Sequence, residues 1–482
     1  MARRASLRLF IAMLLLTLLL PDFRIASAVS ARQQSDQTRS EWSLDPGCFV
    51  YYENNGEALC RPATEQEAQA LSAGKEEGNL RIIPRKDEGL FLQANEINII
   101  LRGTPQLDNF PQARDAFLRA AANWSALIRA PITVVIDVDF GPTRFGAPFP
   151  PGVLGSAISQ QLGRNDFYRE VRNALLASAE SAAELALYNA LPAETVPTDI
   201  GNTSLVFAPS SVLRALRLIA AIADPDGERG QFGPPPSIGF NSAFAFDFDP
   251  RDGVTPGQLD FQAVAEHEVG HVLGFTSQVG ERELNPQGDI AVSIWDIFRF
   301  RRGEAAAISP ASFTSAPRIL SSGGEQVFFA GGEELGLSTG RPDSTGGDGF
   351  QASHWKNNNL TGVTLGVMDP DLAPGERQTI GDNDLKVLDA IGYGAEGADA
   401  GGPRLKKVTF NGSRLTIKGS DLARDVQLVV NFVQVAPPLA IKGNSKKLKI
   451  NGSQADLNLL SGANLVQVIR NGLRSNIVVI SL

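Results

Sequence analysis

The sequence predicts an α+β domain, with a twisted mixed sheet and a buried helix, followed by a small all-β immunoglobulin-like sandwich. Residues 95–141 read as strand, helix and strand, because apolar residues alternate, then recur every three or four positions, then alternate again. Residues 260–274 form a second helical pattern. From residue 404 onward, short alternating runs are separated by Asn-Gly turns, which is typical of β-sandwiches. Hydrophobic residues make up 43% of the chain, enough for a packed core.

Residues 1–28 have the pattern of a secretory signal peptide. Three arginines precede an apolar run from Leu9 to Leu20, and small residues at Ala26 and Ala28 suit a cleavage site. The run is too short to cross a membrane as a mature helix, and no later segment reaches 18 consecutive apolar residues. We therefore expect a secreted protein, extracellular or periplasmic, with no membrane span.

Residues 29–78 form an N-terminal extension or pro-region that contains both cysteines, Cys48 and Cys60. In an exported protein, two cysteines at this separation favour one disulfide. An alternative is a propeptide in which one thiolate caps a metal ion until the segment is removed.

The predicted α+β domain spans residues 79–394. Within it, the Ala- and Glu-rich stretch 167–191 reads as one helix. The other expected elements are strands at 95–103, 132–141, 203–209 and 237–248, and helices at 110–128, 260–274 and 376–394.

The motif HEVGH, at residues 267–271, carries the strongest chemical signal. On a helix, residues four apart lie on one face, so His267 and His271 can bind one metal ion and Glu268 can act as a general base. Asp260 is placed to cap the start of this helix, and Gly274 to end it. A buried helix with two core histidines is the structural alternative, but the chain has only three histidines in all.

A third metal ligand is needed to complete a catalytic zinc site. The common continuation of the motif would place it at Ser277, which is a poor ligand, so we predict His354, the one remaining histidine. Met368 follows 14 residues later and is the only methionine outside the signal peptide. A carboxylate is the alternative third ligand, namely Glu281, Glu283 or Asp296.

The order HEVGHVLGF, long insertion, SHW and GVMDP resembles the leishmanolysin-type metzincins, a family of zinc endopeptidases. The resemblance covers roughly residues 80–394 and is specific between 260 and 393. It implies one catalytic Zn²⁺ on the three histidines, Glu268 as the catalytic residue and a structural Met-turn at Met368. The chain departs from the family in its few cysteines, and it has Pro370 where other metzincins place a tyrosine.

The same resemblance places the strand that binds peptide substrate at about 237–248, although an ordinary sheet strand is equally expected there. The insertion, residues 281–345, is expected to form substrate walls. Asp247, Asp249 and Asp252 could hold Ca²⁺ through oxygen ligands, but a solvated turn is favoured because they do not match a known calcium loop.

After a Gly-rich linker at 395–403, residues 404–482 resemble the IPT/TIG-type sandwich domains. They carry twelve Lys or Arg and three Asp or Glu, while the whole chain has a net charge of −9. This basic domain could dock on the acidic remainder, bind an anionic surface, or simply be soluble. Nucleic acid is not an expected partner, since no recognition motif accompanies the basic residues.

The sequence therefore predicts a secreted zinc endopeptidase that acts on a protein or peptide substrate. Two alternatives remain open: a zinc hydrolase acting on a non-peptide bond, and an inactive binding protein that works through its C-terminal sandwich.

Overall fold

The computed structural model of the protein has a mixed α/β architecture. The predicted signal peptide and most of the linker 395–403 lie outside the residues that it describes. These residues are 48–52, 58–62, 80–84, 96–159, 161–164, 166–220, 234–284, 286–304, 310–340, 346–395, 403–430, 433–461, 463–470, 473–475 and 478–482.

An eight-stranded mixed sheet organises the N-terminal part, in the order β21-β2-β1-β9-β14-β6-β4-β3. Its centre is parallel, with β6 (Thr133–Gly141) between β4 (Asn98–Gly103) and β14 (Ser237–Asn241). β9 (Val153–Ile158) then pairs antiparallel with β14. β6 is buried along almost its whole length, which explains why its sequence, TVVIDVDFG, is so rich in β-branched residues. The strands predicted at 95–103 and 132–141 are confirmed.

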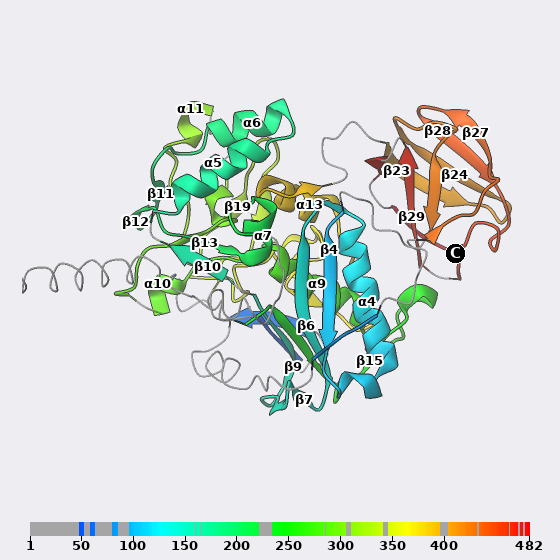
Figure 1. The fold of residues 1–482 in the computed structure, drawn as a ribbon, viewed down its shortest axis with the longest axis horizontal. Coiled ribbons are helices and arrows are strands. Elements are labelled where there is room, and N and C mark those ends of the chain that lie inside the picture. The colour runs from blue at the N-terminus through cyan, green and yellow to red at the C-terminus, as the bar shows by residue number, and fades with distance from the viewer. Residues whose placement is uncertain are drawn as a thin grey trace, which may run out of the picture. The chain divides into compact units, whose positions relative to one another are not determined.

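Two helices lie against this sheet, α4 (Pro111–Ser125) and α9 (Phe261–Leu273) (Figure 1). Pro111 begins α4, where its missing N–H costs nothing. Phe117 of α4 and Phe240 of β14 both contact the Phe261 ring, with centroids 5.0 and 5.2 Å apart respectively. This aromatic contact anchors the first turn of α9 against the sheet and so positions the rest of the helix.

The predicted N-terminal extension, residues 29–78, contributes two strands to the sheet. β1 (Cys48–Tyr52) pairs antiparallel with β9, and β2 (Ala58–Pro62) pairs with β1 on one side and with β21 (Asp371–Leu372) on the other. The prediction that 237–248 is a substrate-binding edge is wrong, because β14 is hydrogen-bonded on both sides, to β6 and β9. β9 is the strand that pairs with the added hairpin, which consists of β1 and β2.

The stretch 167–191, predicted as one helix, forms two: α5 (Tyr168–Ser178) and α6 (Ala182–Asn189). The break has a local cause, since Ser181 accepts a hydrogen bond from the Glu184 amide and the Glu184 carboxylate accepts one from the Ser181 amide. This reciprocal pair starts a new helix. The sequence pattern does not reveal this break between the two helices, because alanine residues lie on both sides of it.

Short elements complete the N-terminal part, and those of the insertion form short helices and strands rather than one long loop. Before the insertion they are β3 (Arg81–Ile82), β5 (Ile128–Arg129), β7 (Thr143–Arg144), β8 (Ala147–Pro148), β10 (Gln161–Arg164), β11 (Val196–Thr198), β12 (Gly201–Thr203), β13 (Val206–Pro209), α7 (Ser210–Ala215), β15 (Phe246–Asp247) and β16 (Leu259–Asp260). From the insertion onward they are α10 (Glu281–Leu284), β17 (Val292–Ser293), β18 (Arg299–Arg301), α11 (Pro310–Phe313), β19 (Gln326–Phe328), β20 (Leu335–Leu337), α12 (Asn358–Thr361), α13 (Asp382–Ala390) and β22 (Gly394–Ala395).

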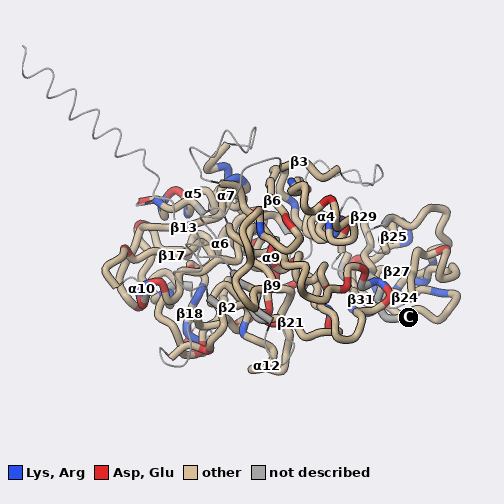
Figure 2. The backbone as a smooth tube through the Cα atoms, turned by 90° about the horizontal axis from the view of Figure 1, so that it is seen from below, with Lys and Arg blue, Asp and Glu red and all other residues tan. Residues whose placement is uncertain are grey.

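Residues 403–482 have a hydrophobic core of their own, built from alternate strand residues such as Leu415, Ile417, Leu448 and Ile450. One sheet contains β23 (Arg404–Phe410), β24 (Arg414–Ser420), β28 (Lys447–Asn451) and β27 (Ala440–Asn444); the other contains β26 (Val433–Gln434), β25 (Gln427–Val430), β29 (Ala463–Arg470), β30 (Leu473–Arg474) and β31 (Val478–Ser481). Basic residues are visible along these strands, for example near β24 (Figure 2). Among the described residues, no helix is both long and apolar enough to cross a membrane.

Candidate metal centre

The three histidines of the chain come together at one buried point. α9 begins at the Asp260 cap, whose side chain accepts from the Ala263 amide, and ends at Gly274, as predicted. It presents His267 and His271 one turn apart, and the loop between β20 and α12 brings His354 to them. Together with Cys60, these histidines form a group whose candidate ligand atoms all lie within 4.8 Å of one another, so the group could hold a metal ion.

The carboxylates considered as third ligands are not part of this group. Asp296 is buried, accepts from Ser277 Oγ at 2.8 Å and pairs with Arg299 at 3.0 Å. Glu283 accepts hydrogen bonds from Ser322. Among the described residues, His354 is therefore the side chain that completes the histidine set.

Each histidine is oriented by a backbone carbonyl that contacts its Nδ1 atom. The distances are 2.8 Å from His267 to Val367 O, 2.7 Å from His271 to Phe275 O and 2.9 Å from His354 to Gln351 O. A carbonyl oxygen can only accept, so each Nδ1 must carry the hydrogen. In the neutral ring, the other nitrogen, Nε2, then carries a lone pair.

These three lone pairs converge. The Nε2 atoms of His267 and His354 are 2.9 Å apart, and Nε2 of His271 is buried with no hydrogen-bond partner among the described residues. Two lone pairs facing each other without a proton between them repel. A cation at the shared point would satisfy all three nitrogens at once, and the carbonyls would then hold the ligands in position, as such partners commonly do.

Burial also favours the uncharged histidines that metal binding requires. It lowers the pKa of His267 to about 4, and burial together with the nearby His267 lowers the pKa of His271 to about 3. Burial, followed by the charges of the other two rings, lowers the pKa of His354 well below its ordinary value. All three rings are therefore neutral ligands across the physiological pH range.

Glu268 follows the first histidine of this cluster on α9. The side chain is fully buried, and neither oxygen has a hydrogen-bond partner within the described part of the chain. Burial raises the pKa of Glu268 well above its usual value, and the charge of Arg144 offsets this only in part. An unpaired buried carboxylate is costly. A nearby metal ion and its water would account for it, so the observation fits the predicted general base.

Met368 lies directly beneath α9, as a Met-turn would require. It is fully buried, and a Cβ atom added to Gly270 would lie only 2.3 Å from its sulfur. Gly270 thus allows the methionine to contact the helix between the two histidine turns. The carbonyl of Val367, one residue earlier, accepts from His267, so this turn also orients a ligand.

Asp384, on α13, organises the same turn and was not singled out from the sequence. Its carboxylate accepts from the Val367 amide at 2.9 Å, the Gly381 amide at 2.7 Å and Trp355 Nε1 at 2.7 Å. Val367 orients His267, and Trp355 follows His354 in the chain. One buried carboxylate therefore connects the supports of two candidate ligands.

We expect Asp384→Asn to destabilise the fold by about 1–3 kcal/mol, because a buried donor loses its acceptor. Burial raises the pKa of Asp384 from 3.8 to about 6, so the folded protein binds this proton more tightly than the unfolded chain. The contribution of the protonated Asp384 carboxyl to the free energy of unfolding is fully present below pH 3.8 and is lost as the pH rises through about 6. Urea unfolding of both proteins at several pH values between 4 and 7 would check this.

The variant should lack this part of the pH dependence, whereas Asp382→Asn, at an exposed position on the same helix, should retain it. An unchanged pH dependence in Asp384→Asn would show that another group titrates.

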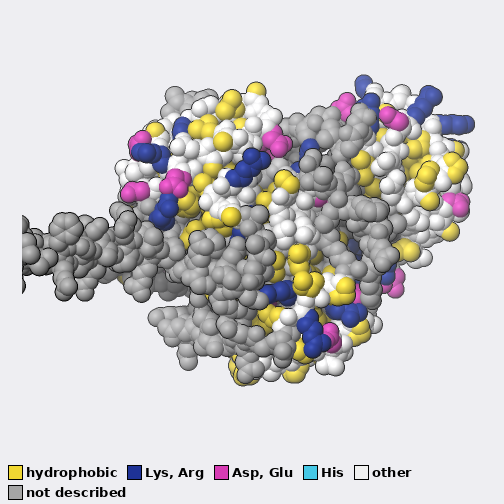
Figure 3. Space-filling model, in the orientation of Figure 1, with side chains coloured by type: hydrophobic (Ala, Val, Ile, Leu, Met, Phe, Trp, Pro, Cys, Tyr) yellow, Lys and Arg dark blue, Asp and Glu magenta, His cyan; other side chains and the backbone are white. Residues whose placement is uncertain are grey.

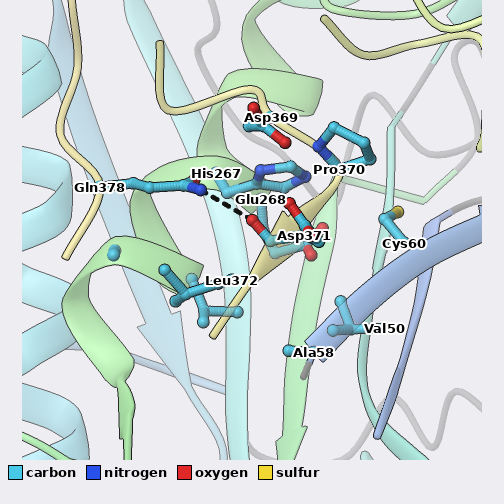
Figure 4. Close-up of a pocket in the computed structure, with 12 residues that line it drawn as sticks. Val50, Ala58, Cys60, His267, Glu268, Asp369, Pro370, Asp371, Leu372 and Gln378 are labelled. Carbon is cyan, nitrogen blue, oxygen red and sulfur yellow. Dashed lines mark hydrogen bonds between the residues drawn. The ribbon is translucent and has the colours of Figure 1, made fainter. Parts of the chain in front are cut away.

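The N-terminal hairpin covers the site. A small cavity beside His267 and Glu268 is bounded by α9, by the residues after Met368 and by the hairpin (Figure 4). The hairpin contributes Val50, Ala58 and Cys60 to its lining. No histidine is visible on the face shown in Figure 3, in keeping with the burial of all three. In this conformation the cluster is closed to large molecules.

The acidic turn considered for calcium is held by internal contacts. Asp247 accepts from the amide and hydroxyl of Thr255 at 2.8 and 2.7 Å, and Asp249 pairs with Arg251 at 2.5 Å. Asp252 ends a short 3-10 helix. These bonds are those of a turn held by its own side chains, in which Asp247 is buried rather than solvated.

No protein-family model and no curated protein matches this chain.

Proposed function

We propose that the protein is a secreted zinc-dependent endopeptidase related to the leishmanolysin-type metzincins. The observation that carries this proposal is the convergence of three histidine lone pairs beside a buried, unpaired Glu268. Three neutral imidazoles with one open position are the ligand set that catalytic zinc prefers. A structural zinc site has no use for a free carboxylate beside it.

The sheet supports a peptide as substrate. β9 and β21 are the two strands that flank the hairpin, and each binds it through antiparallel pairing. Both therefore present backbone groups to an extended chain that passes the histidines. A peptide substrate would use the same groups by strand addition once the hairpin is displaced. We propose β9, rather than 237–248, as the substrate-binding strand.

Zinc held by His267, His271 and His354 would supply a Lewis acid that polarises a peptide carbonyl and lowers the pKa of a water ligand to about 7. Glu268 would accept the water proton and then donate it to the leaving amine. His267, His271 and His354 are held by their carbonyl partners, so they need little reorganisation during the reaction.

We further propose that residues 404–482 form an immunoglobulin-like sandwich with an accessory role, such as binding an anionic surface. A non-peptidase zinc hydrolase remains the second candidate. It is favoured by the small cavity beside Glu268, which in the closed conformation admits only a small group.

The test is hydrolysis of an unfolded protein by the zinc-loaded chain, beside small amide and ester substrates. Because the hairpin covers the site, the assay includes Val50→Asp, which places a carboxylate at a position only 4% exposed on the hairpin. A buried, unpaired charge is costly, so the hairpin should leave its groove and protein cleavage should increase. Chelation should abolish cleavage, and zinc should restore it.

Val50→Thr has nearly the shape of valine without the charge and is the matched control, which should behave like the wild type. If Val50→Asp cleaved small esters but no protein, the non-peptidase alternative would replace our proposal. Hydrogen exchange in β9 would confirm that the hairpin had in fact been displaced.

A further inference from the structure

The outer face of one sheet of the C-terminal domain is lined by basic side chains. The four strands of this sheet, in the order β23-β24-β28-β27, turn residues such as Leu415 and Leu448 into the core, so that alternate residues face solvent. None of the four strands contains an aspartate or a glutamate. The outward residues that are both basic and exposed are Lys407, Arg414, Lys418, Lys442, Lys447 and Lys449.

The strand register places most of these charges directly opposite one another. Lys407 pairs with Lys418, and Lys418 with Lys447, so three lysines form one row across the sheet. In the next row, Lys449 pairs with Lys442. Side chains in such pairs have Cβ atoms about 4.5–5.5 Å apart, and like charges placed opposite each other destabilise a sheet. The arrangement therefore lowers the stability of the domain, and an anionic partner lying on this face would offset the loss.

The three aspartates of the domain lie in loops rather than on these strands. Asp425 pairs with Arg470 of the other sheet at 3.7 Å, and Asp456 accepts hydrogen bonds from the amide and hydroxyl of Ser453 at 2.8 and 2.7 Å. In Figure 3, basic side chains project from the region that Figure 1 labels β27 and β28. The face thus presents its charge to solvent, where a partner can reach it.

We propose that this basic face binds the surface of a lipid bilayer that contains anionic lipids, without inserting into it. The inference names the partner for the accessory role proposed above and rests on that role, but not on the zinc chemistry. Clusters of roughly four to eight Lys or Arg bind anionic lipid surfaces, and each basic group near the surface adds about fivefold to the partition coefficient. The attraction extends over about 8 Å at physiological salt, so a flat sheet can bring all six groups within range of a flat surface.

The chemistry of the face favours lipid over other polyanions. Among the described outward residues none is aromatic, so nucleic-acid bases and sugars have no ring on which to stack. Five of the six basic residues are lysines. Lysine is depleted at protein interfaces, and it acts as a point charge, whereas arginine is preferred where a carboxylate is held by two parallel hydrogen bonds. Mobile lipid headgroups can gather beneath such point charges.

Co-sedimentation of the full-length protein with vesicles tests this inference. The protein should bind vesicles of phosphatidylcholine mixed with phosphatidylglycerol, stay in solution with phosphatidylcholine alone, and be released by salt. Lys418→Gln combined with Lys447→Gln should weaken binding roughly 30-fold, because two charges are lost. The same double variant should unfold at a higher urea concentration than the wild type, because two opposed like charges are removed. Lost binding can therefore be distinguished from lost folding.

Lys386→Gln combined with Arg470→Gln is the matched control, because it removes two positive charges from α13 and from the other sheet of the sandwich. It should bind the mixed vesicles as the wild type does. Lys442→Gln combined with Lys449→Gln neutralises the second opposed pair and should reproduce the loss seen with the first, so the result does not depend on one variant.

The inference would be overturned by absence of binding to the mixed vesicles at low salt, by equal binding to both kinds of vesicle, or by an equal loss in the control. Binding to soluble poly-glutamate but not to the mixed vesicles would also overturn it, and the partner would then be an acidic polypeptide. Vesicle binding is measured without substrate, so Glu268→Gln should bind as the wild type does. A protein that binds the mixed vesicles but cleaves nothing would refute the endopeptidase alone.

Discussion

Replacing Glu268 by glutamine should reduce protein cleavage by several orders of magnitude and leave the metal in place. Glutamine has the same shape but cannot accept the water proton, and a positioned general base contributes on the order of 10²–10⁴ in rate. Neither carboxylate oxygen of Glu268 has a hydrogen-bond partner among the described residues, so the substitution should break no hydrogen bond between them. Rates should be compared in the Val50→Asp background, where the groove is open, with metal content measured for each protein.

Glu266→Gln is the matched control, because it makes the same change two residues away on the same buried helix. Glu266 accepts from Gln262 at 2.9 Å and also from Asn123 on α4, so it faces away from the histidines. This variant should keep most of its activity. Equal losses in both variants would mean that the helix, rather than one carboxylate, had been disturbed, and retained activity in Glu268→Gln would refute its role as base.

The sequence predicted the ends of the motif helix and the metal ligands, because these depend on residue type and on local geometry. The helix containing the HEVGH motif begins and ends at the predicted residues, because a capping aspartate and a glycine with φ of 138° act locally. His354 could be predicted across the 82 residues that separate it from His271 only by elimination, since the chain has no histidine outside the motif and this position. The rarity of histidine thus predicted the third ligand, whereas the spacing of the common motif pointed to Ser277, which is a poor ligand.

What the sequence did not reveal depends on contacts between distant segments. Nothing in the polar stretch around Cys48 and Cys60 shows that it pairs with β9 and β21, which lie about 100 and 310 residues further along the chain. Pairing partners are chosen by the whole sheet, so strand patterns alone do not specify them. The incorrect prediction of the substrate-binding edge has the same cause. Residues 237–248 read as a strand, but only the order of strands in the sheet shows that β14 is internal.

Asp384 shows the same limit at the level of a single side chain. An aspartate in the first turn of a helix is ordinary in sequence, because carboxylates favour helix N-termini. Its second role, connecting Val367 and Trp355, exists only once three separate segments have met. The ligands of the site could therefore be predicted from residue types, whereas their supports could not.

Replacing His354 by alanine should abolish stoichiometric zinc binding. The variant keeps His267 and His271, but two neutral ligands in a buried site hold zinc far more weakly than three, and affinity should fall by at least the 10–100-fold that is typical of losing a supporting partner alone. The measurement is metal content after dialysis, made on the Cys60→Ser background so that no sulfur can replace the lost ligand. Unfolding should be followed in parallel, since the metal stabilises the folded state.

Gln351→Ala provides the control, because it removes a neighbouring side chain but keeps the backbone carbonyl that orients His354. It should retain one zinc per chain. If His354→Ala also retained one zinc, the third ligand would have to be sought elsewhere, and Glu268, whose carboxylate has no hydrogen-bond partner among the described residues, would be a candidate. Glu268 would then be a ligand rather than a base, so the outcome for His354 also decides how the result at Glu268 must be interpreted.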